Sequence, residues 1–188
     1  MLFQGLMIVI AVTGGVACGK SSFCEQFRSE GGKSVSYFSC DAEVAELLGG
    51  AEIQTAICSL DGAGEVLVRD GYDKEVVRQQ AFDEPGFREN LENLLHPIIL
   101  ERSIDFLNNL SNEVRLALVE VPLLYEADFR VPRDLELVDA ASRSTQVDRL
   151  VRQRGLAPEM AEKIIEAQYP LDKKVEHSDI VVWNDGES

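Results

Sequence analysis

Basic residues are scarce in this chain. Among its 188 residues, 18 lysines and arginines stand against 33 aspartates and glutamates, which gives a formal net charge of −15. This charge disfavours nucleic acids and anionic membranes, so neither is expected as a partner. A phosphate-binding site stays compatible with it, because such a site needs local donors and not a basic protein.

Long apolar runs and metal-binding cysteine patterns are also missing. The apolar run before Thr13 is too short to span a bilayer, and no secretory signal precedes it. The four cysteines show neither a C-x-x-C pair nor a metal-ligand spacing. They are Cys18, Cys24, Cys40 and Cys58. We therefore expect four reduced thiols in a cytoplasmic protein.

The length predicts a single domain over residues 7–188. Residues 1–6 precede a second methionine, and Leu2-Phe3-Gln4-Gly5 is typical of a protease-site remnant; a native extension is the alternative. We expect a monomer, with weak self-association as the alternative.

One glycine-rich stretch carries the clearest chemical signal. Residues 14–21 read Gly-Gly-Val-Ala-Cys-Gly-Lys-Ser, which fits the phosphate-binding loop G-x-x-x-x-G-K-S. The apolar run Ile8–Val12 precedes the loop as a strand would. Phe23 and Phe27 follow it at the spacing of one buried helix face. Strand, loop and helix in this order are the context that the motif requires.

This loop predicts a site for a nucleoside triphosphate and Mg²⁺. Its backbone N–H groups and the new helix terminus favour an anion. We expect Lys20 to reach the β- and γ-phosphates and the Ser21 hydroxyl to bind Mg²⁺. A glycine-rich turn that binds nothing is the alternative. The predicted phosphate-binding residues are Gly14, Gly15, Val16, Ala17, Cys18, Gly19, Lys20, Ser21 and Ser22.

Alternation of strands and helices predicts an α/β fold with a doubly wound parallel sheet. The other predicted strands are Ser34–Cys40, Leu116–Val121, Leu135–Val138 and Ile180–Trp183. The core is expected at about 7–42, 111–142 and 175–186. A helical insertion is expected at about 43–110. The charged helical stretch at about 143–174 is either a lid or a solvated pair of surface helices.

Helix boundaries follow from capping residues. Asp73 is expected to cap a helix that runs to Phe82, and Pro85 and Pro97 to be the first residues of two successive helices. Pro158 starts another helix that stops before Pro170.

Asp41 is a candidate catalytic residue. It ends the second predicted strand, at the edge where parallel sheets place ligands. A helix N-cap for residues 42–48 is the other interpretation, and the two roles are compatible.

Several separated segments then fit one family pattern. They are the loop, Ser39-Cys40-Asp41, Leu95-His96-Pro97, Pro122-Leu123-Leu124-Tyr125-Glu126, Gln146 with Arg149, Gln168, Ser178-Asp179 and Asn184. In this order they resemble the dephospho-coenzyme A kinases over residues 7–186. The His-Pro pair and the Pro-Leu-Leu-Tyr-Glu segment are much more specific than the loop, which many enzymes share.

The resemblance implies transfer of the ATP γ-phosphoryl group to the ribose 3′-hydroxyl of dephospho-coenzyme A, the last step of coenzyme A biosynthesis. It implies that Asp41 is the base, that Lys20 and Arg149 act in catalysis, and that Arg149 belongs to the lid. It places Asn184 near the adenine. The residues implied for the acceptor are His96, Pro122, Leu123, Tyr125 and Glu126.

Three departures from the family pattern stand out. The loop has Cys18 where a serine is usual, which leaves its backbone donors unchanged. Only one acid, Asp41, stands where the family often has Asp-Ala-Asp. The second lid arginine is replaced by Gln153, and either Arg152 or Arg154 is its substitute.

Two other functions fit the loop. One is a different small-metabolite or nucleotide kinase. The other is a GTPase-type switch, for which residues 61–64 give a D-x-x-G match; no Asn-Lys-x-Asp segment for guanine exists in the chain.

Overall fold

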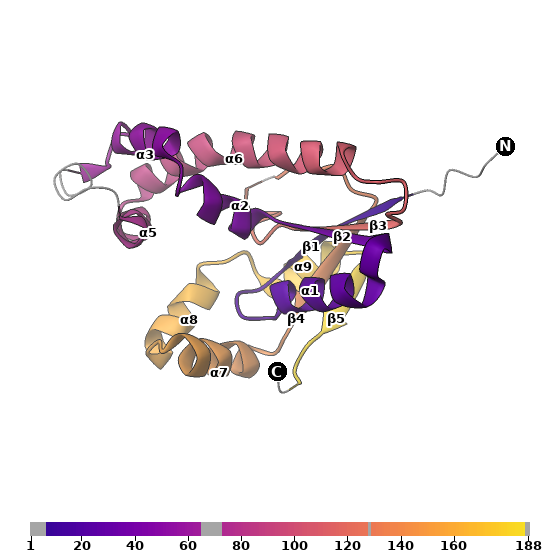
Figure 1. Ribbon diagram of the computed structural model, residues 1–188. Coiled ribbons are helices and arrows are strands. Elements are labelled where there is room, and N and C mark those ends of the chain that lie inside the picture. The colour runs from indigo at the N-terminus through magenta and orange to yellow at the C-terminus, as the bar shows by residue number, and fades with distance from the viewer. Residues whose placement is uncertain (1–6, 65–72, 128, 187–188) are drawn as a thin grey trace. The chain divides into compact units, whose positions relative to one another are not determined.

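This computed structural model contains a five-stranded parallel sheet (Figure 1). The structure describes residues 7–64, 73–127 and 129–186, so residues 1–6, predicted to be a protease-site remnant, lie outside the described residues. The strands are β1 (Ile8–Gly14), β2 (Val35–Ser39), β3 (Leu116–Glu120), β4 (Leu135–Ala140) and β5 (Ile180–Trp183). All five predicted strands are present, and the predicted α/β class is confirmed.

The strand order β2-β3-β1-β4-β5 puts β1 in the middle of the sheet. In register, Val12 of β1 pairs with Glu120 of β3, and Gly14 pairs with Asp139 of β4. The carboxyl end of β1 therefore lies between two acidic residues on neighbouring strands. Ligands of open α/β sheets bind at this edge.

Apolar residues of β1 and its neighbours make the core. Ala11 and Val12 are fully buried, as expected for a central parallel strand. Helix α1 (Lys20–Gly31) packs on the sheet through Cys24, which is also fully buried. The prediction that Phe27 shares the buried face is wrong, since Phe27 is 44% exposed and contacts the Phe23 ring.

The chain divides into two compact units, one of residues 1–40 and 103–188 and one of residues 41–102. The second unit overlaps the predicted insertion at 43–110, and the single-domain assignment stays a prediction. Helices α2 (Cys40–Leu47), α3 (Ala51–Cys58), α5 (Lys74–Asp83) and α6 (Pro85–Asn108) contribute residues to this second unit. Among its described residues, all regular structure is helical. An Arg102 guanidinium joins α6 to α2 through Glu43 and Glu46, at 2.7 and 3.0 Å.

The predicted helix start at Pro97 is wrong. Pro97 lies inside α6, which runs without a break for 24 residues from Pro85. Proline removes one hydrogen bond from a helix interior, but the buried positions Leu95 and Ile99 stay in one helical register across it. Burial of this continuous face outweighs the local cost. The Asp73 cap is confirmed: its side chain accepts a bond from the Glu75 N–H.

The first unit also contains α7 (Arg143–Arg154), α8 (Pro158–Glu166) and α9 (Leu171–His177). Ser142 caps α7 by accepting a bond from the Thr145 N–H. The start of α8 at Pro158 is confirmed, whereas α9 was not predicted. In Figure 1, α7 and α8 lie side by side. No helix in the described ranges is long and apolar enough to cross a membrane.

Candidate active site

The glycine-rich loop joins β1 to α1, as predicted, and two of its glycines lie where a side chain would be strained. Gly14 has φ +150°, and a Cβ there would lie 2.1 Å from the Asp139 carbonyl oxygen. Gly19 has φ +118°, and a Cβ there would lie 2.4 Å from the Asn184 side-chain nitrogen. At Gly14 a side chain would collide with backbone, whereas at Gly19 it would displace the Asn184 side chain and strain the dihedral angles, so both positions favour glycine.

Ala17 is the one described residue other than glycine with positive φ, at +57°. The left-handed region costs a residue with a Cβ about 1–2 kcal/mol. Such a conformation persists only where surrounding contacts hold it. The loop therefore depends on bonds from outside its own sequence.

Lys20 is the first residue of α1, and its side chain is folded back over the loop. It is only 9% exposed, and its Nζ donates to the Gly15 carbonyl oxygen at 2.8 Å. An ammonium group has three donors, so two remain for an anion held by the loop. Lys20 is placed as a phosphate-binding lysine would be.

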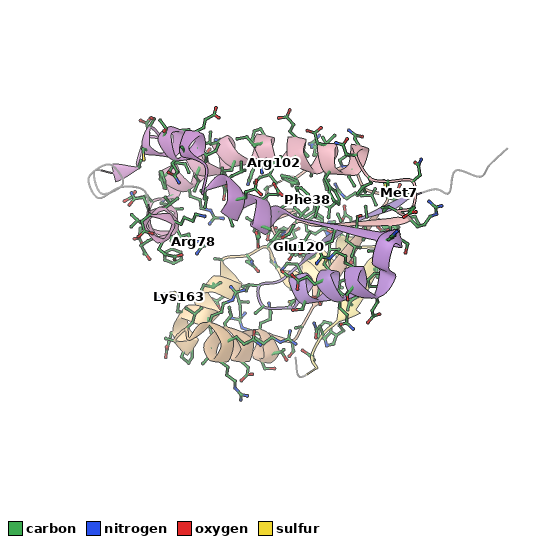
Figure 2. All side chains as sticks on the ribbon, viewed as in Figure 1. Met7, Phe38, Arg78, Arg102, Glu120 and Lys163 are labelled. Carbon is green, nitrogen blue, oxygen red and sulfur yellow. The ribbon has the colours of Figure 1, made fainter. Side chains whose placement is uncertain are left out.

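Ser21 follows on the same helix, and its hydroxyl donates to Glu120 Oε1 at 2.7 Å. Glu120, labelled in Figure 2, ends β3 and is 1% exposed. The other carboxylate oxygen accepts from the hydroxyls of Tyr37 and Ser39, the second at 3.1 Å. Because the Ser21 proton is used on Glu120, the lone pairs of its oxygen remain for a cation.

Asp139 is the second buried acid at this edge, and sequence reasoning missed it. It is fully buried, and within the described part of the chain neither carboxylate oxygen has a hydrogen-bond partner. Burial raises its pKa to about 6, although the charges of Lys20 and Arg149 oppose this rise. Nearby Glu120 raises the pKa further. The predicted strand stopped one residue before this position, so no pattern marked it.

Arg149 lies on α7 and is 7% exposed, bound to the outer side of the loop. Its Nη1 donates to the carbonyl oxygens of Ala17 and Cys18 at 3.1 and 2.7 Å. Its Nη2 donates to Asn184 Oδ1 and the Gly186 carbonyl at 3.2 and 3.0 Å. The guanidinium therefore ties the loop to the turn after β5. Its predicted role in a mobile lid stays a prediction.

Lys174 of α9 is a fully buried cation that the sequence did not reveal. Its Nζ pairs with Glu126 at 2.7 Å and donates to the carbonyls of Gly14 and Pro122 at 3.3 and 3.2 Å. Burial lowers its pKa, and the bond to Glu126 opposes this change. Lys174 thus joins the start of the phosphate loop to the predicted acceptor segment.

The predicted acceptor segment, Pro122–Glu126, forms turns after β3. Within it, Leu124 is buried and Leu123 is half-buried. The Tyr125 hydroxyl donates to Glu136 at 2.5 Å, and its ring contacts Tyr169. These contacts fix the segment within the first unit, and its role toward an acceptor stays a prediction.

Two other predicted site residues belong to the second unit. Asp41 is exposed in the first turn of α2, because that helix begins at Cys40 and not after Asp41. The predicted N-cap position is therefore wrong by two residues. His96 is half-buried in the interior of α6, not at the opening of a helix. The chemical roles of both residues stay predictions.

An open pocket of about 660 Å³ lies beside α7 and the turn after β5. Its lining is mostly polar. The residues are Ser144, Thr145, Asp148, Arg149, Arg152, Gln153, Asp185 and Gly186. Asn184, predicted to lie near an adenine, is bonded to Arg149 in this lining. Arg152 pairs with Asp148 at 2.6 Å on the exposed side of α7.

All four cysteines are free thiols, as predicted. Cys18 lies in the loop but is fully buried, and burial raises the pKa of its thiol. Ser22 is exposed on the first turn of α1.

Comparison with known proteins settles the family. A family model described as "Dephospho-CoA kinase" matches residues 8–188. This chain belongs to the dephospho-CoA kinase family. The match covers the loop, the second unit and α7–α9 together, so it rests on far more than the widely shared loop. The family resemblance predicted from the sequence is confirmed.

Curated relatives of this kinase family agree. A dephospho-CoA kinase of Anaeromyxobacter dehalogenans is 35% identical over 185 residues, which are 96% of this chain and 85% of that protein. One of Symbiobacterium thermophilum is 33% identical over 182 residues, 96% of this chain and 75% of the relative.

Solved structures show the same kinase fold. A crystal structure of a Thermus thermophilus protein superposes with a TM-score of 0.80 at 26% identity, covering 97% of this chain and 91% of that one. A dephospho-CoA kinase from Campylobacter jejuni gives 0.56 at 21%, covering 95% and 89%. An Acinetobacter baumannii shikimate kinase gives 0.51 at 12%, with 96% and 86% covered, so it shares the fold alone.

Proposed function

We propose that this protein transfers the γ-phosphoryl group of ATP to the ribose 3′-hydroxyl of dephospho-CoA, giving CoA and ADP. Family membership supports the substrate pair. The observation that carries the chemistry is that Lys20 and Ser21 lie next to each other at the end of the loop, each held in place. Lys20 bonds to the Gly15 carbonyl, and Ser21 bonds to the buried Glu120. Phosphoryl transfer depends chiefly on positioning and charge neutralisation, and this pair supplies both.

The loop and Lys20 hold the triphosphate. Backbone N–H groups around the start of α1 favour an anion, and the helix terminus adds a positive potential. The two free donors of Lys20 Nζ bind phosphate oxygens. Arg149 adds positive charge from the outer side of the loop, where its bonds to Ala17 and Cys18 hold it.

Mg²⁺ fits this site because oxygen atoms suited to it are present. Ser21 Oγ has lone pairs left, and the carboxylates of Glu120 and Asp139 lie at the same sheet edge. Ser21 would hold the ion, with Glu120 fixing the hydroxyl. When bound, the ion neutralises charge on the phosphate oxygens.

Asp41 serves as the base. Its carboxylate accepts the proton of the acceptor hydroxyl while that oxygen forms the new bond to phosphorus, and ADP leaves. Its exposure in the first turn of α2 leaves the side chain accessible to a ligand. The acceptor is assigned to His96 and Pro122–Glu126 from the family resemblance.

The adenine is assigned to the pocket beside α7. The bonds of Arg149 support this assignment. Arg149 lines the pocket and bonds to Asn184 and Gly186 as well as to the phosphate loop. The cytoplasmic location and the monomeric state stay predictions.

An acceptor panel tests the proposal. Purified protein is incubated with Mg·ATP and dephospho-CoA, AMP, adenosine, shikimate or pantothenate. ADP release is expected with dephospho-CoA, and mass spectrometry should show one phosphate added at the ribose 3′ position. More efficient phosphorylation of another acceptor would replace this proposal by a different metabolite kinase.

A further inference from the structure

Two glutamines bind both polar groups of one residue in the phosphate loop. Gln168 Oε1 accepts from the Val16 N–H at 2.7 Å, and Gln146 Nε2 donates to the Val16 carbonyl oxygen at 2.8 Å. A backbone N–H only donates and a carbonyl only accepts, so the orientation of each side-chain amide is fixed by its partner. No alternative amide orientation satisfies both contacts.

These glutamines come from the segment that was expected to be a lid. Gln146 lies on α7 and is 3% exposed, and half-buried Gln168 follows α8. They stand 130 and 152 positions from Val16 in the sequence. Burial of a neutral amide is unfavourable unless its hydrogen bonds are made, so the contact with Val16 is also what permits Gln146 to be buried.

The direction of the loop's N–H groups follows from these bonds. In a trans peptide, the C=O and the next residue's N–H point to opposite sides. Gln146 holds the Val16 carbonyl, which turns the Ala17 N–H away from α7. Arg149 holds the carbonyls of Ala17 and Cys18 in the same way. Side chains of α7 therefore bind three successive carbonyls of the loop and turn the following N–H groups to the other side. The Cys18 N–H donates to the Gly15 carbonyl oxygen at 3.4 Å, so the N–H groups of Ala17 and Gly19 are the ones that this arrangement presents.

The glutamines also act where the loop is strained. Ala17, with φ +57°, directly follows Val16. Gln168 fixes the peptide plane before Val16, and Gln146 fixes the plane after it. Together they hold the backbone on the N-terminal side of the strained residue, as Arg149 does on the other side.

We infer that Gln146 and Gln168 are positioning residues for the nucleotide: they hold the Val16 peptide so that the loop's N–H groups face the phosphates before ATP arrives. This inference rests on the proposed binding of ATP by the loop. Pre-formed donors need no ordering when a ligand binds, which favours affinity. The segment 143–174 is then a fixed support of the loop at this contact.

A crossed pair of substitutions separates this inference from a general effect of charge. Gln168→Glu keeps an oxygen that accepts from the Val16 N–H. Gln146→Glu instead places a carboxylate against the Val16 carbonyl, so the bond is lost and repulsion replaces it. Both variants add one negative charge near the same peptide. Repulsion of ATP is therefore common to both, and the difference between them reports the hydrogen bond.

Binding of ADP and ATP is measured by calorimetry. We expect Gln168→Glu to bind nucleotide roughly tenfold more tightly than Gln146→Glu, the ratio that one hydrogen bond provides. Neutral Gln146→Met and Gln168→Met are each expected to weaken binding about tenfold. Gln26→Met is the matched control, because exposed Gln26 of α1 bonds only to Glu30 among the described residues. Its affinity should stay within about twofold.

Steady-state kinetics add a second readout. Both Met variants should raise the KM for ATP while the KM for dephospho-CoA stays unchanged. A merely structural role would lower the active fraction and leave both KM values alone. Equal losses in the two Glu variants, or unchanged nucleotide affinity in the Met variants, would overturn the inference.

Hydrogen exchange keeps the inference testable independently of the proposed function. Gln168→Met should speed exchange in a peptide that covers residues 14–19, whereas Gln26→Met should not. If the wild-type protein fails to bind ATP, the proposed function fails. In that case unchanged exchange in Gln168→Met would also reject the contact at Val16.

Discussion

The two acids that flank β1 are equally buried but differ in their hydrogen bonding. Glu120 ends β3 with 1% exposure and accepts bonds from three hydroxyl groups. Asp139 is the next-to-last residue of β4 with no exposure, and neither of its oxygens has a hydrogen-bond partner in the described structure. Hydroxyl donors stabilise the charge of the first, whereas the second depends on the positive charges of Lys20 and Arg149.

This difference indicates that the two acids have different roles at the loop. The hydroxyl bonds to Glu120 occupy both of its carboxylate oxygens and fix Ser21. Burial without hydrogen bonds disfavours the ionised form of Asp139. The positive charges of Lys20 and Arg149 favour that form, so its ionisation is coupled to these two residues. Four substitutions break or sharpen the comparison, and they follow in order of expected effect.

Lys20→Met removes one of the two cations on which Asp139 depends. An arginine acting on the transferring phosphoryl group is worth about 10³–10⁵ in kcat in related enzymes, and we expect loss of the Lys20 cation to cost a similar factor. The pKa of Asp139 should also rise further, since Lys20 lowers it. Steady-state assays measure the loss of kcat, and melting curves recorded over a range of pH report the change in the pKa of Asp139. Activity close to wild type would refute the assignment of Lys20.

Asp41→Asn tests an acid in the opposite environment, exposed and proposed to act as the base. A positioned base contributes about 10²–10⁴ in rate, so kcat should fall by that factor with little change in Tm. The acidic residue Glu52, in the first turn of α3, is the matched control as Glu52→Gln. A fall in Tm without a fall in kcat would make Asp41 a structural residue of α2.

Glu120→Gln removes the charge that three hydroxyls stabilise. Hydrogen bonds to a charged group contribute about 1.5–3 kcal/mol, so the free energy of unfolding at pH 8 should fall by about 1–3 kcal/mol. Exposed Glu30, which accepts a bond only from Gln26 among the contacts described, gives the control Glu30→Gln. Urea unfolding measures the difference. An unchanged or higher stability would show that the hydroxyl bonds do not favour the charged form.

Asp139→Asn should have the opposite sign. The folded pKa of about 6 lies above the unfolded value of about 3.9, so the native state binds more protons between these values. The penalty is absent below about pH 4, grows as the pH rises, and is complete above about pH 6. We expect the variant to be more stable by about 1–2 kcal/mol at pH 8 and to lose this advantage at pH 4. A variant that is less stable at pH 8 would show that ionised Asp139 is favoured by the fold.

Much of the fold could be predicted because its signals are local. The central strands β1 and β3 are apolar runs, and the loop is a contiguous motif whose glycines have a steric reason. Pro97 was misleading, since a proline is a local stop signal and only the burial of α6 on both sides of it shows that the helix continues.

The active-site contacts were harder, because they join distant positions. Lys20 and Ser21 were predicted from the motif, and the structure places both at the loop. Asp139 lies in β4 but directly follows the predicted strand Leu135–Val138, where a charged residue looks like the start of a surface turn. Lys174 lies in a charged stretch typical of an exposed helix, and nothing in its spacing shows that three oxygens surround its ammonium group. The sequence contains these residues and their partners, but it does not show which of them are in contact.

The long separation of the loop from its supports has a consequence for protein synthesis. A ribosome makes the N-terminal part of a chain first, at about 5–20 residues per second. The loop at residues 14–21 leaves the ribosome early, yet its carbonyl and N–H partners stand 130 to 160 positions later. During that interval the nascent chain lacks the side chains that hold Ala17 in its left-handed conformation. The nucleotide-binding form of the loop is therefore a late product of folding, although its sequence is among the first to be translated.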